Sequence, residues 1–283
     1  MWWRSIQTAG LILGAWLVVS ANAFVVLFGV RLRHSHCRGL AMKPLAILGL
    51  LLWNTAAFSA DIAGQEMKLP TAERQVRVTY FHAPGEAKRP AALLLHGGGS
   101  FDRRLKDYAS YASSLANAGI DAYLVYYYGD GQSAYDFTTS YVQWAKLVGD
   151  LADHLMQQPQ SNGKVGLVGF SNGGTLATGA AALDPKINAA VIYYGTPPYW
   201  LRRHVDHYPP LLILHGDADA VIPAEAGKEL ARRAEEVGTD VDLVIYPGES
   251  HGFGSNITAK NGNDALTRTV AFLQKQLLGR VKE

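Results

Sequence analysis

A serine stands in this chain where an apolar run gives way to a helical pattern of small and apolar residues. In the stretch VGLVGFSNGGTLATGAAAL, residues 165–183, Ser171 has Gly169 two positions before it and Gly173 two positions after it. A serine in a sharp turn from a strand into a helix has a strained backbone, and its hydroxyl projects clear of the sheet. Side chains at the flanking positions would collide with their neighbours, so we expect Gly169 and Gly173 to form the structural elbow of the turn. The pattern predicts that Ser171 is a nucleophile rather than a plain helix N-cap.

An acid and a base follow two later strand-like runs. Asp219 lies in LHGDADAVIP and His251 lies in YPGESHGF, each after an apolar stretch. A serine hydroxyl becomes a good nucleophile when a base accepts its proton, and histidine titrates near neutrality. A buried carboxylate then fixes the tautomer of that histidine. The order serine, aspartate, histidine is typical of α/β-hydrolases, so we predict a catalytic triad of Ser171, Asp219 and His251, with Asp217 as the rival acid.

Glycines follow a third apolar run. In LLLHGGGS, residues 93–100, three consecutive glycines come after His96. Glycines here let backbone N–H groups face the negative oxygen that develops during acyl transfer, and each such donor contributes about 2.7–4 kcal/mol of transition-state stabilisation. We predict an oxyanion hole made by the N–H groups of Gly98 and Asn172, with Gly99 as a substitute for Gly98. His96 is expected to brace this loop.

Alternating strands and helices must position these residues. Strands are predicted over 75–81, 91–99, 121–128, 164–170, 189–195, 210–216 and 240–248, and helices over 104–119, 135–159, 224–238 and 263–279, with a further helix directly after Ser171. Strict alternation implies a mostly parallel sheet flanked by helices on both faces, with ligands beyond the carboxyl ends of the strands. The segment 196–208 is too short for a large cap domain.

Composition and charge limit the classes of protein to consider. The chain has 283 residues, 48% of them hydrophobic, which is enough for one sizeable core. Residues 1–60 hold five basic residues and no acidic one, so residues 61–283 carry 21 basic and 24 acidic residues, a net charge of −3. This mildly acidic part predicts no nucleic-acid partner. Cys37 is the only cysteine, which excludes a disulfide framework and a cysteine-based metal site.

Two apolar segments occupy the N-terminal region, residues 1–60, ahead of the predicted α/β-hydrolase domain at 61–283. Residues 9–30 carry no charge and are long enough for a transmembrane helix. Residues 42–60 look like a signal peptide, with a lysine near the start, an apolar run and then small residues. The charge pattern predicts that the domain is exported, either to the periplasm or the medium or as a membrane-anchored protein.

Two interpretations of this region remain open. In one, translation starts at Met42, and the signal is cleaved after Ser59 or Ala60. In the other, both apolar segments are membrane helices, and the basic loop between them stays in the cytoplasm. A third alternative cleaves the chain after Ala23. The first two place the predicted active site outside the cytoplasm.

A wider set of motifs surrounds the three residues of the predicted triad. The set is Gly169-Phe170-Ser171-Asn172-Gly173-Gly174, Tyr193-Tyr194-Gly195, His215-Gly216 with Asp219 and Pro223, and Tyr246-Pro247-Gly248 with His251-Gly252-Phe253. With these motifs, residues from about 90 to 277 resemble the dienelactone hydrolase family. The resemblance implies an α/β-hydrolase fold and carries the acid of the triad onto Asp219 rather than Asp217. The family's founding enzymes use cysteine where this chain has Ser171, a glutamate near the strand that here ends at His96, and an arginine at the position of Ser255. We therefore expect an ordinary carboxylic ester as the substrate rather than a dienelactone.

The sequence as a whole predicts a serine hydrolase that cleaves small-molecule carboxylic esters, with no cofactor and no metal. A small serine peptidase or amidase is the alternative enzyme, because it needs the same triad. A binding protein on a hydrolase scaffold is the non-enzymatic alternative. The complete set of serine, acid, base and glycines favours an enzyme over this last interpretation.

Overall fold

The computed structural model describes most of the chain after the N-terminal region. The described ranges are 62–98, 101–129, 132–133, 136–201 and 205–279. The segments predicted at 9–30 and 42–60, the cleavage sites after Ser59 and Ala60, and Gly99 lie outside the described residues. Within these ranges, the helices lack the combination of length and apolar composition that crossing a bilayer requires.

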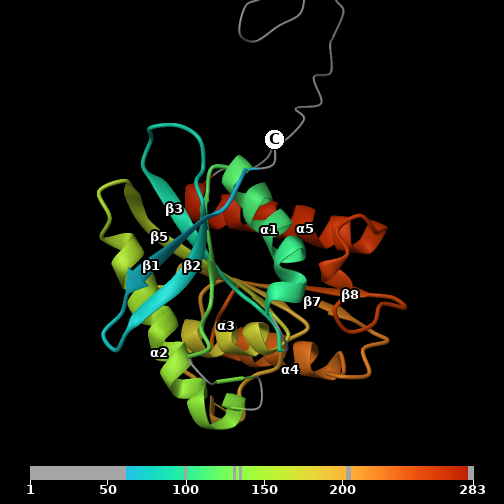
Figure 1. Ribbon diagram of the computed structural model, residues 1–283. Coiled ribbons are helices and arrows are strands. Elements are labelled where there is room, and N and C mark those ends of the chain that lie inside the picture. The colour runs from blue at the N-terminus through green and yellow to red at the C-terminus, as the bar shows by residue number, and fades with distance from the viewer. Residues whose placement is uncertain (1–61, 99–100, 130–131, 134–135, 202–204, 280–283) are drawn as a thin grey trace, which may run out of the picture. The chain divides into compact units, whose positions relative to one another are not determined.

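A sheet of eight strands forms the centre of the described chain (Figure 1). The strands are β1 (Gln65–Pro70), β2 (Gln75–Phe81), β3 (Arg89–Leu95), β4 (Asp121–Val125), β5 (Ser161–Phe170), β6 (Ala189–Tyr193), β7 (Leu211–Gly216) and β8 (Val241–Tyr246). Their order in the sheet is β1-β2-β4-β3-β5-β6-β7-β8. β2 pairs antiparallel with β1 and β4, and every pairing from β4 across to β8 is parallel. The carboxyl ends of β3, β5, β7 and β8 therefore meet at one edge of the sheet.

Helices cover both faces of this sheet (Figure 1). One face is covered by α1 (Phe101–Asn117) and α5 (Lys260–Leu273), and the other by α2 (Phe137–Met156), α3 (Asn172–Leu183) and α4 (Glu225–Glu236). A strand between two helical layers has no side that faces water, so both of its faces are apolar. The central strand β3, with the sequence RPAALLL, accordingly has every residue buried. The core consists of two apolar layers, one on each side of the sheet.

This arrangement confirms the predicted fold class, a mostly parallel sheet with helices on both faces. Several element boundaries differ from the prediction by a few residues, as where β3 ends at Leu95 and β4 at Val125, and two further differences concern the ends of the domain. β1 was not expected, because QEMKLP buries Leu69 alone and has no apolar run that would mark a strand. The last helix begins at Lys260, and it changes at Gln274 to a π-helical turn where the Gln274 side chain donates a hydrogen bond to the carbonyl of Ala118 at 3.0 Å. Between β6 and β7, the described residues hold the single turn of 3₁₀ helix Tyr199–Leu201, so this connection adds no cap domain.

Candidate active site

The turn from β5 into α3 places Ser171 at the carboxyl edge of the sheet. Its backbone has φ 55° and ψ −118°, which residues other than glycine rarely adopt. A Cβ on Gly169 would overlap the carbonyl oxygen of Gly173, and a Cβ on Gly173 would overlap the carbonyl oxygen of Leu95. The two glycines therefore leave room for the tight turn that holds Ser171 in this strained conformation.

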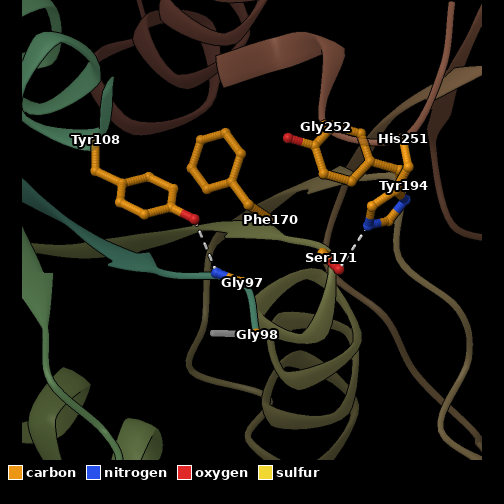
Figure 2. A pocket seen from close by; sticks show the side chains of 8 residues that line it. All are labelled: Gly97, Gly98, Tyr108, Phe170, Ser171, Tyr194, His251 and Gly252. Atoms are coloured by element: carbon orange, nitrogen blue, oxygen red, sulfur yellow. Dashed lines mark hydrogen bonds between the residues drawn. The ribbon is translucent and has the colours of Figure 1, made fainter. Parts of the chain in front are cut away.

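Ser171, His251 and Asp219 form a continuous chain of hydrogen bonds. Ser171 Oγ lies 2.9 Å from His251 Nε2, and Figure 2 shows the two side chains pointing toward each other. His251 Nδ1 lies 2.7 Å from Asp219 Oδ2. A carboxylate accepts hydrogen bonds, so Nδ1 of His251 carries the ring proton, and Nε2 is left to accept the proton of the serine hydroxyl. The side chain of His251 is 20% exposed and that of Asp219 is fully buried, so His251 faces the solvent side and Asp219 lies behind it.

The carboxylate of Asp219 is held through both of its oxygens. Oδ1 accepts the backbone N–H groups of Val221 and Ile222, each at 2.9 Å, while Oδ2 faces His251. Burial by itself raises the pKa of Asp219, but the hydrogen bonds from Ile222, His251 and Val221 outweigh burial and leave this pKa below its ordinary value. Asp219 is therefore ionised at neutral pH, and its negative charge faces the ring of His251.

The turn after β3 lies beside Ser171 and is held from two sides. The hydroxyl of Tyr108, on α1, accepts the backbone N–H of Gly97 at 3.0 Å (Figure 2). The hydroxyl of Tyr127 donates to the carbonyl of His96 at 2.7 Å. The N–H of Gly97 is therefore engaged within the protein and does not face the cleft as a donor. Gly98 is the next residue, and it lines the same cleft as Ser171.

Asn172, the second predicted oxyanion donor, is the first residue of α3 and follows Ser171 directly. The first N–H groups of a helix have no partner within the helix, and they carry the positive end of its dipole. The two predicted donors, Gly98 and Asn172, therefore come from different elements, one from the turn after β3 and one from the start of α3.

His96 braces the turn after β3 as an uncharged ring. Its Nδ1 donates to the carbonyl of Gly97 at 2.8 Å, and its ring stacks on Tyr127 with the ring centroids 4.3 Å apart. Burial lowers the pKa of His96 to about 4, against the opposite effect of the hydrogen bond to Gly97. His96 therefore holds the turn in shape without bringing a positive charge to the site at neutral pH.

A small cleft opens above Ser171 (Figure 2). Its volume is about 110 Å³, and its lining residues are Gly97, Gly98, Tyr108, Phe170, Ser171, Tyr194, His251 and Gly252. Tyr194 has a positive φ of 37°, and its ring lies edge-on to the ring of His251 with centroids 4.9 Å apart. The side chains of the cleft other than those of Ser171 and His251 are aromatic, so this part of the site suits an uncharged, compact group of a substrate.

Asp217 lies outside the chain of hydrogen bonds. Its Oδ1 accepts the backbone N–H of Gly248 at 2.6 Å, and its side chain is exposed. The structure therefore brings Asp219, and not Asp217, into contact with His251. Tyr108 is a residue of the site that the sequence did not reveal, because its contact with Gly97 depends on how α1 packs beside the turn after β3, and no local spacing marks it. The described residues contain no cluster of three or more His, Cys, Asp or Glu side chains that could bind a metal ion.

Solved structures of the same fold include esterases. A Pyrobaculum calidifontis esterase superposes with a TM-score of 0.63 and 17% sequence identity, covering 75% of this chain and 85% of the esterase. A dienelactone hydrolase homologue from Klebsiella pneumoniae gives a TM-score of 0.61 and 20% identity, covering 76% of this chain and 99% of that one. Identities at this level show a shared fold.

Sequence comparison points to one family. A carboxymethylenebutenolidase homologue of Yersinia pestis is 30% identical over 102 residues, which is 33% of this chain and 38% of the relative. The chain thus matches less than half of the length of this relative. The family model described as the dienelactone hydrolase family matches residues 79–277, which is more than half of the chain. The resemblance predicted from the motifs is confirmed, and the chain belongs to the dienelactone hydrolase family.

Proposed function

We propose that this protein is a serine hydrolase that cleaves carboxylic esters through an acyl-enzyme intermediate. The observation that carries this proposal is the pair of hydrogen bonds from Ser171 Oγ to His251 Nε2, at 2.9 Å, and from His251 Nδ1 to Asp219 Oδ2, at 2.7 Å. Membership of the dienelactone hydrolase family and the esterases among structures of the same fold support the same chemistry.

In the first half of the reaction, Ser171 Oγ attacks the carbonyl carbon of the ester while His251 Nε2 takes the hydroxyl proton. The ionised carboxylate of Asp219 stabilises the resulting imidazolium and keeps the ring in place. When the tetrahedral intermediate collapses, the bond from carbon to the alcohol oxygen breaks. His251 then gives its proton to the departing alcohol, and the acyl group stays on Ser171.

In the second half, water takes the place of the alcohol. His251 Nε2 accepts a proton from this water, whose oxygen attacks the acyl carbon, and the protonated His251 then returns the proton to Ser171 Oγ as the carboxylic acid leaves. In both halves the negative oxygen of the intermediate binds the N–H groups of Gly98 and Asn172, assisted by the N-terminal end of α3.

The substrate we propose is an ordinary ester rather than an anionic lactone. The position where founding members of the family carry an arginine is Ser255 here, four residues after His251. Ser255 Oγ donates to the carbonyl of Gly252 at 2.8 Å, within its own turn. This position therefore supplies no positive charge for a substrate carboxylate, while the cleft beside Ser171 is lined by aromatic rings.

Active-site labelling followed by substrate profiling tests this proposal. A fluorophosphonate should form one covalent adduct, located at Ser171 by peptide mass spectrometry, and Ser171→Ala should abolish it. Nitrophenyl esters of graded acyl length and the matching anilides should then show hydrolysis of esters ahead of amides. Labelling that persists in Ser171→Ala would disprove the assignment of the nucleophile, and faster turnover of anilides would make the enzyme an amidase or peptidase.

We also propose that the catalytic domain is exported. The support is the signal-like sequence of residues 42–60, which precedes a domain with a net charge of −3. Cell fractionation followed by N-terminal sequencing of the native protein tests this. A mature N-terminus at Ala60 or Asp61 in the periplasm or medium would support cleavage, and an intact chain in the membrane fraction would support an anchor. An intact chain that is soluble in the cytoplasm would refute export.

A further inference from the structure

A fully buried histidine lies next to the acid of the proposed triad, and the reaction described above does not use it. His215 is on β7, and its side chain is completely inaccessible to solvent. Its Nε2 lies 2.8 Å from the carbonyl oxygen of Ile222. A carbonyl oxygen accepts hydrogen bonds, so Nε2 carries the proton of the ring. Nδ1 is buried and has no hydrogen-bond partner among the described residues.

The ring of His215 is therefore neutral, with one defined donor. A second proton on Nδ1 would be a buried N–H without an acceptor, which is costly. Gly227 of α4 packs against this atom, since a Cβ on Gly227 would lie 2.8 Å from it. Burial lowers the pKa of His215, although Asp219 and the bond to Ile222 act in the opposite direction. Among the described residues, the other titratable groups that interact with the ring are His251, from the loop after β8, and Glu225, from α4.

His215 is linked to Asp219 through the backbone of Ile222. The Ile222 carbonyl accepts from His215, and the Ile222 N–H donates to Asp219 Oδ1 at 2.9 Å. The backbone of Ile222 is thus fixed at its carbonyl by His215 of β7 and at its N–H by the carboxylate of Asp219. The same Nε2 also lies 3.4 Å from Asp219 Oδ2, the oxygen that faces His251.

We propose that His215 is a positioning residue of the active site, whose Nε2–H fixes Ile222 and thereby orients the carboxylate of Asp219 toward His251. His215 contacts neither Ser171 nor a substrate in this scheme, and it exchanges no proton during turnover. The kinetic part of its test rests on the proposed ester hydrolysis, and the spectroscopic part does not.

Three variants separate positioning from loss of stability. His215→Leu fills the same buried space and removes the donor. His215→Gln keeps an N–H that can reach Ile222. Ile187→Val is the control for a small loss of packing, because Ile187 is 2% exposed and lies before β6, at the opposite edge of the sheet from the triad. Each variant is compared with the wild type for thermal midpoint and for the number of sites that a fluorophosphonate labels.

Turnover per labelled site is the kinetic measurement. A misplacement of a catalytic group by about 1 Å can cost about 100-fold in rate, so we expect kcat per labelled site to fall about 10- to 100-fold in His215→Leu. KM should stay within about twofold, since the substrate does not touch His215. His215→Gln should recover most of this loss, and Ile187→Val should match the wild type.

Proton NMR reports on the positioning directly. The proton between His251 Nδ1 and Asp219 Oδ2 should give a resonance far downfield of the amides in the wild type and in His215→Gln. In His215→Leu this signal should broaden or disappear through faster exchange while the fold is intact. A protein that hydrolyses no ester would disprove the proposed function, yet the NMR comparison would still decide the role of His215. The role is refuted if His215→Leu keeps the downfield signal unchanged or, in an active enzyme, keeps wild-type kcat per site.

Discussion

Replacing Asp219 with asparagine has an outcome that the contacts of this carboxylate dictate. The N–H groups of Val221 and Ile222 both point at Oδ1, so this place requires an acceptor. In Asp219→Asn, the amide oxygen must take this place, and the amide NH₂ group then occupies the place of Oδ2. There it lies against His251 Nδ1, which is 2.7 Å from Oδ2 in the wild type. A donor now stands where an acceptor stood.

In Asp219→Asn, we expect His251 to switch its tautomer. Nδ1 must become an acceptor for the amide N–H, so the ring proton moves to Nε2. Nε2 then donates toward Ser171 Oγ and is unable to accept the hydroxyl proton. The same reversal in the triad of a serine protease lowers kcat about 10⁴-fold, and that factor corresponds to about 5.4 kcal/mol of activation free energy. We expect a loss of this size here, with little change in the cleft itself.

The assay compares Asp219→Asn with Asp217→Asn and the wild type, using a short nitrophenyl ester. Circular dichroism and the thermal midpoint check that both variants are folded. Asp217→Asn should retain most of the activity, because an asparagine oxygen can still accept the N–H of Gly248. Retention of more than about a tenth of wild-type kcat in folded Asp219→Asn would refute the tautomer argument. A larger loss in Asp217→Asn would show that the acid had been assigned to the wrong residue.

Three further predictions concern the elements around the triad. Gly173→Ala should abolish activity and lower the free energy of unfolding, because its Cβ would overlap the carbonyl of Leu95; kinetics and urea unfolding measure both. Tyr108→Phe should lower the free energy of unfolding by about 1–3 kcal/mol and reduce kcat for all esters alike, since it leaves the buried N–H of Gly97 without an acceptor. His96 has a folded pKa of about 4, below its unfolded value of about 6.5, so the unfolded chain binds the proton first as pH falls. Urea unfolding should accordingly show a loss of up to about 3 kcal/mol between pH 6.5 and 4, and a smaller loss in His96→Gln.

The fold could be predicted from the sequence because its central strands are buried on both faces. A run such as LLL in β3, or VGLVGF in β5, has no polar position to interrupt it. The segments between the runs have apolar residues at helical spacing. This signal fails at the edge of the sheet. β1 exposes most of its side chains, so its strand conformation depends on pairing with β2, from Gln65–Tyr80 to Pro70–Gln75. The hydrophobicity of a short segment does not predict which other segment it pairs with.

In the candidate site too, short motifs predict some features, while others depend on how separate elements pack. The turn at Ser171 is encoded within a few residues, so the elbow could be predicted together with its glycines. The order of residues favours Asp219 but leaves Asp217 as a rival two residues away, and the resemblance to a family supports Asp219. The support for the turn at Gly97 could not be predicted either, because the hydrogen bond from the Gly97 N–H to the Tyr108 hydroxyl depends on how α1 packs beside the turn.

The contacts of Asp217 show how the two acids in LHGDAD, residues 214–219, differ. The Asp217 N–H donates to the carbonyl of Tyr246 at 3.1 Å, and the Ala218 N–H donates to the carbonyl of Glu249 at 3.0 Å. Together with the bond from Gly248 to the Asp217 carboxylate, they tie the loop after β7 to the loop that carries His251. Two of these three bonds join backbone groups at both ends, so they do not depend on the Asp217 side chain. Asp217 thus adds one of three bonds between the loops, whereas the carboxylate of Asp219 contacts His251 directly. We therefore expect the two asparagine variants to differ by orders of magnitude, although their positions are two residues apart.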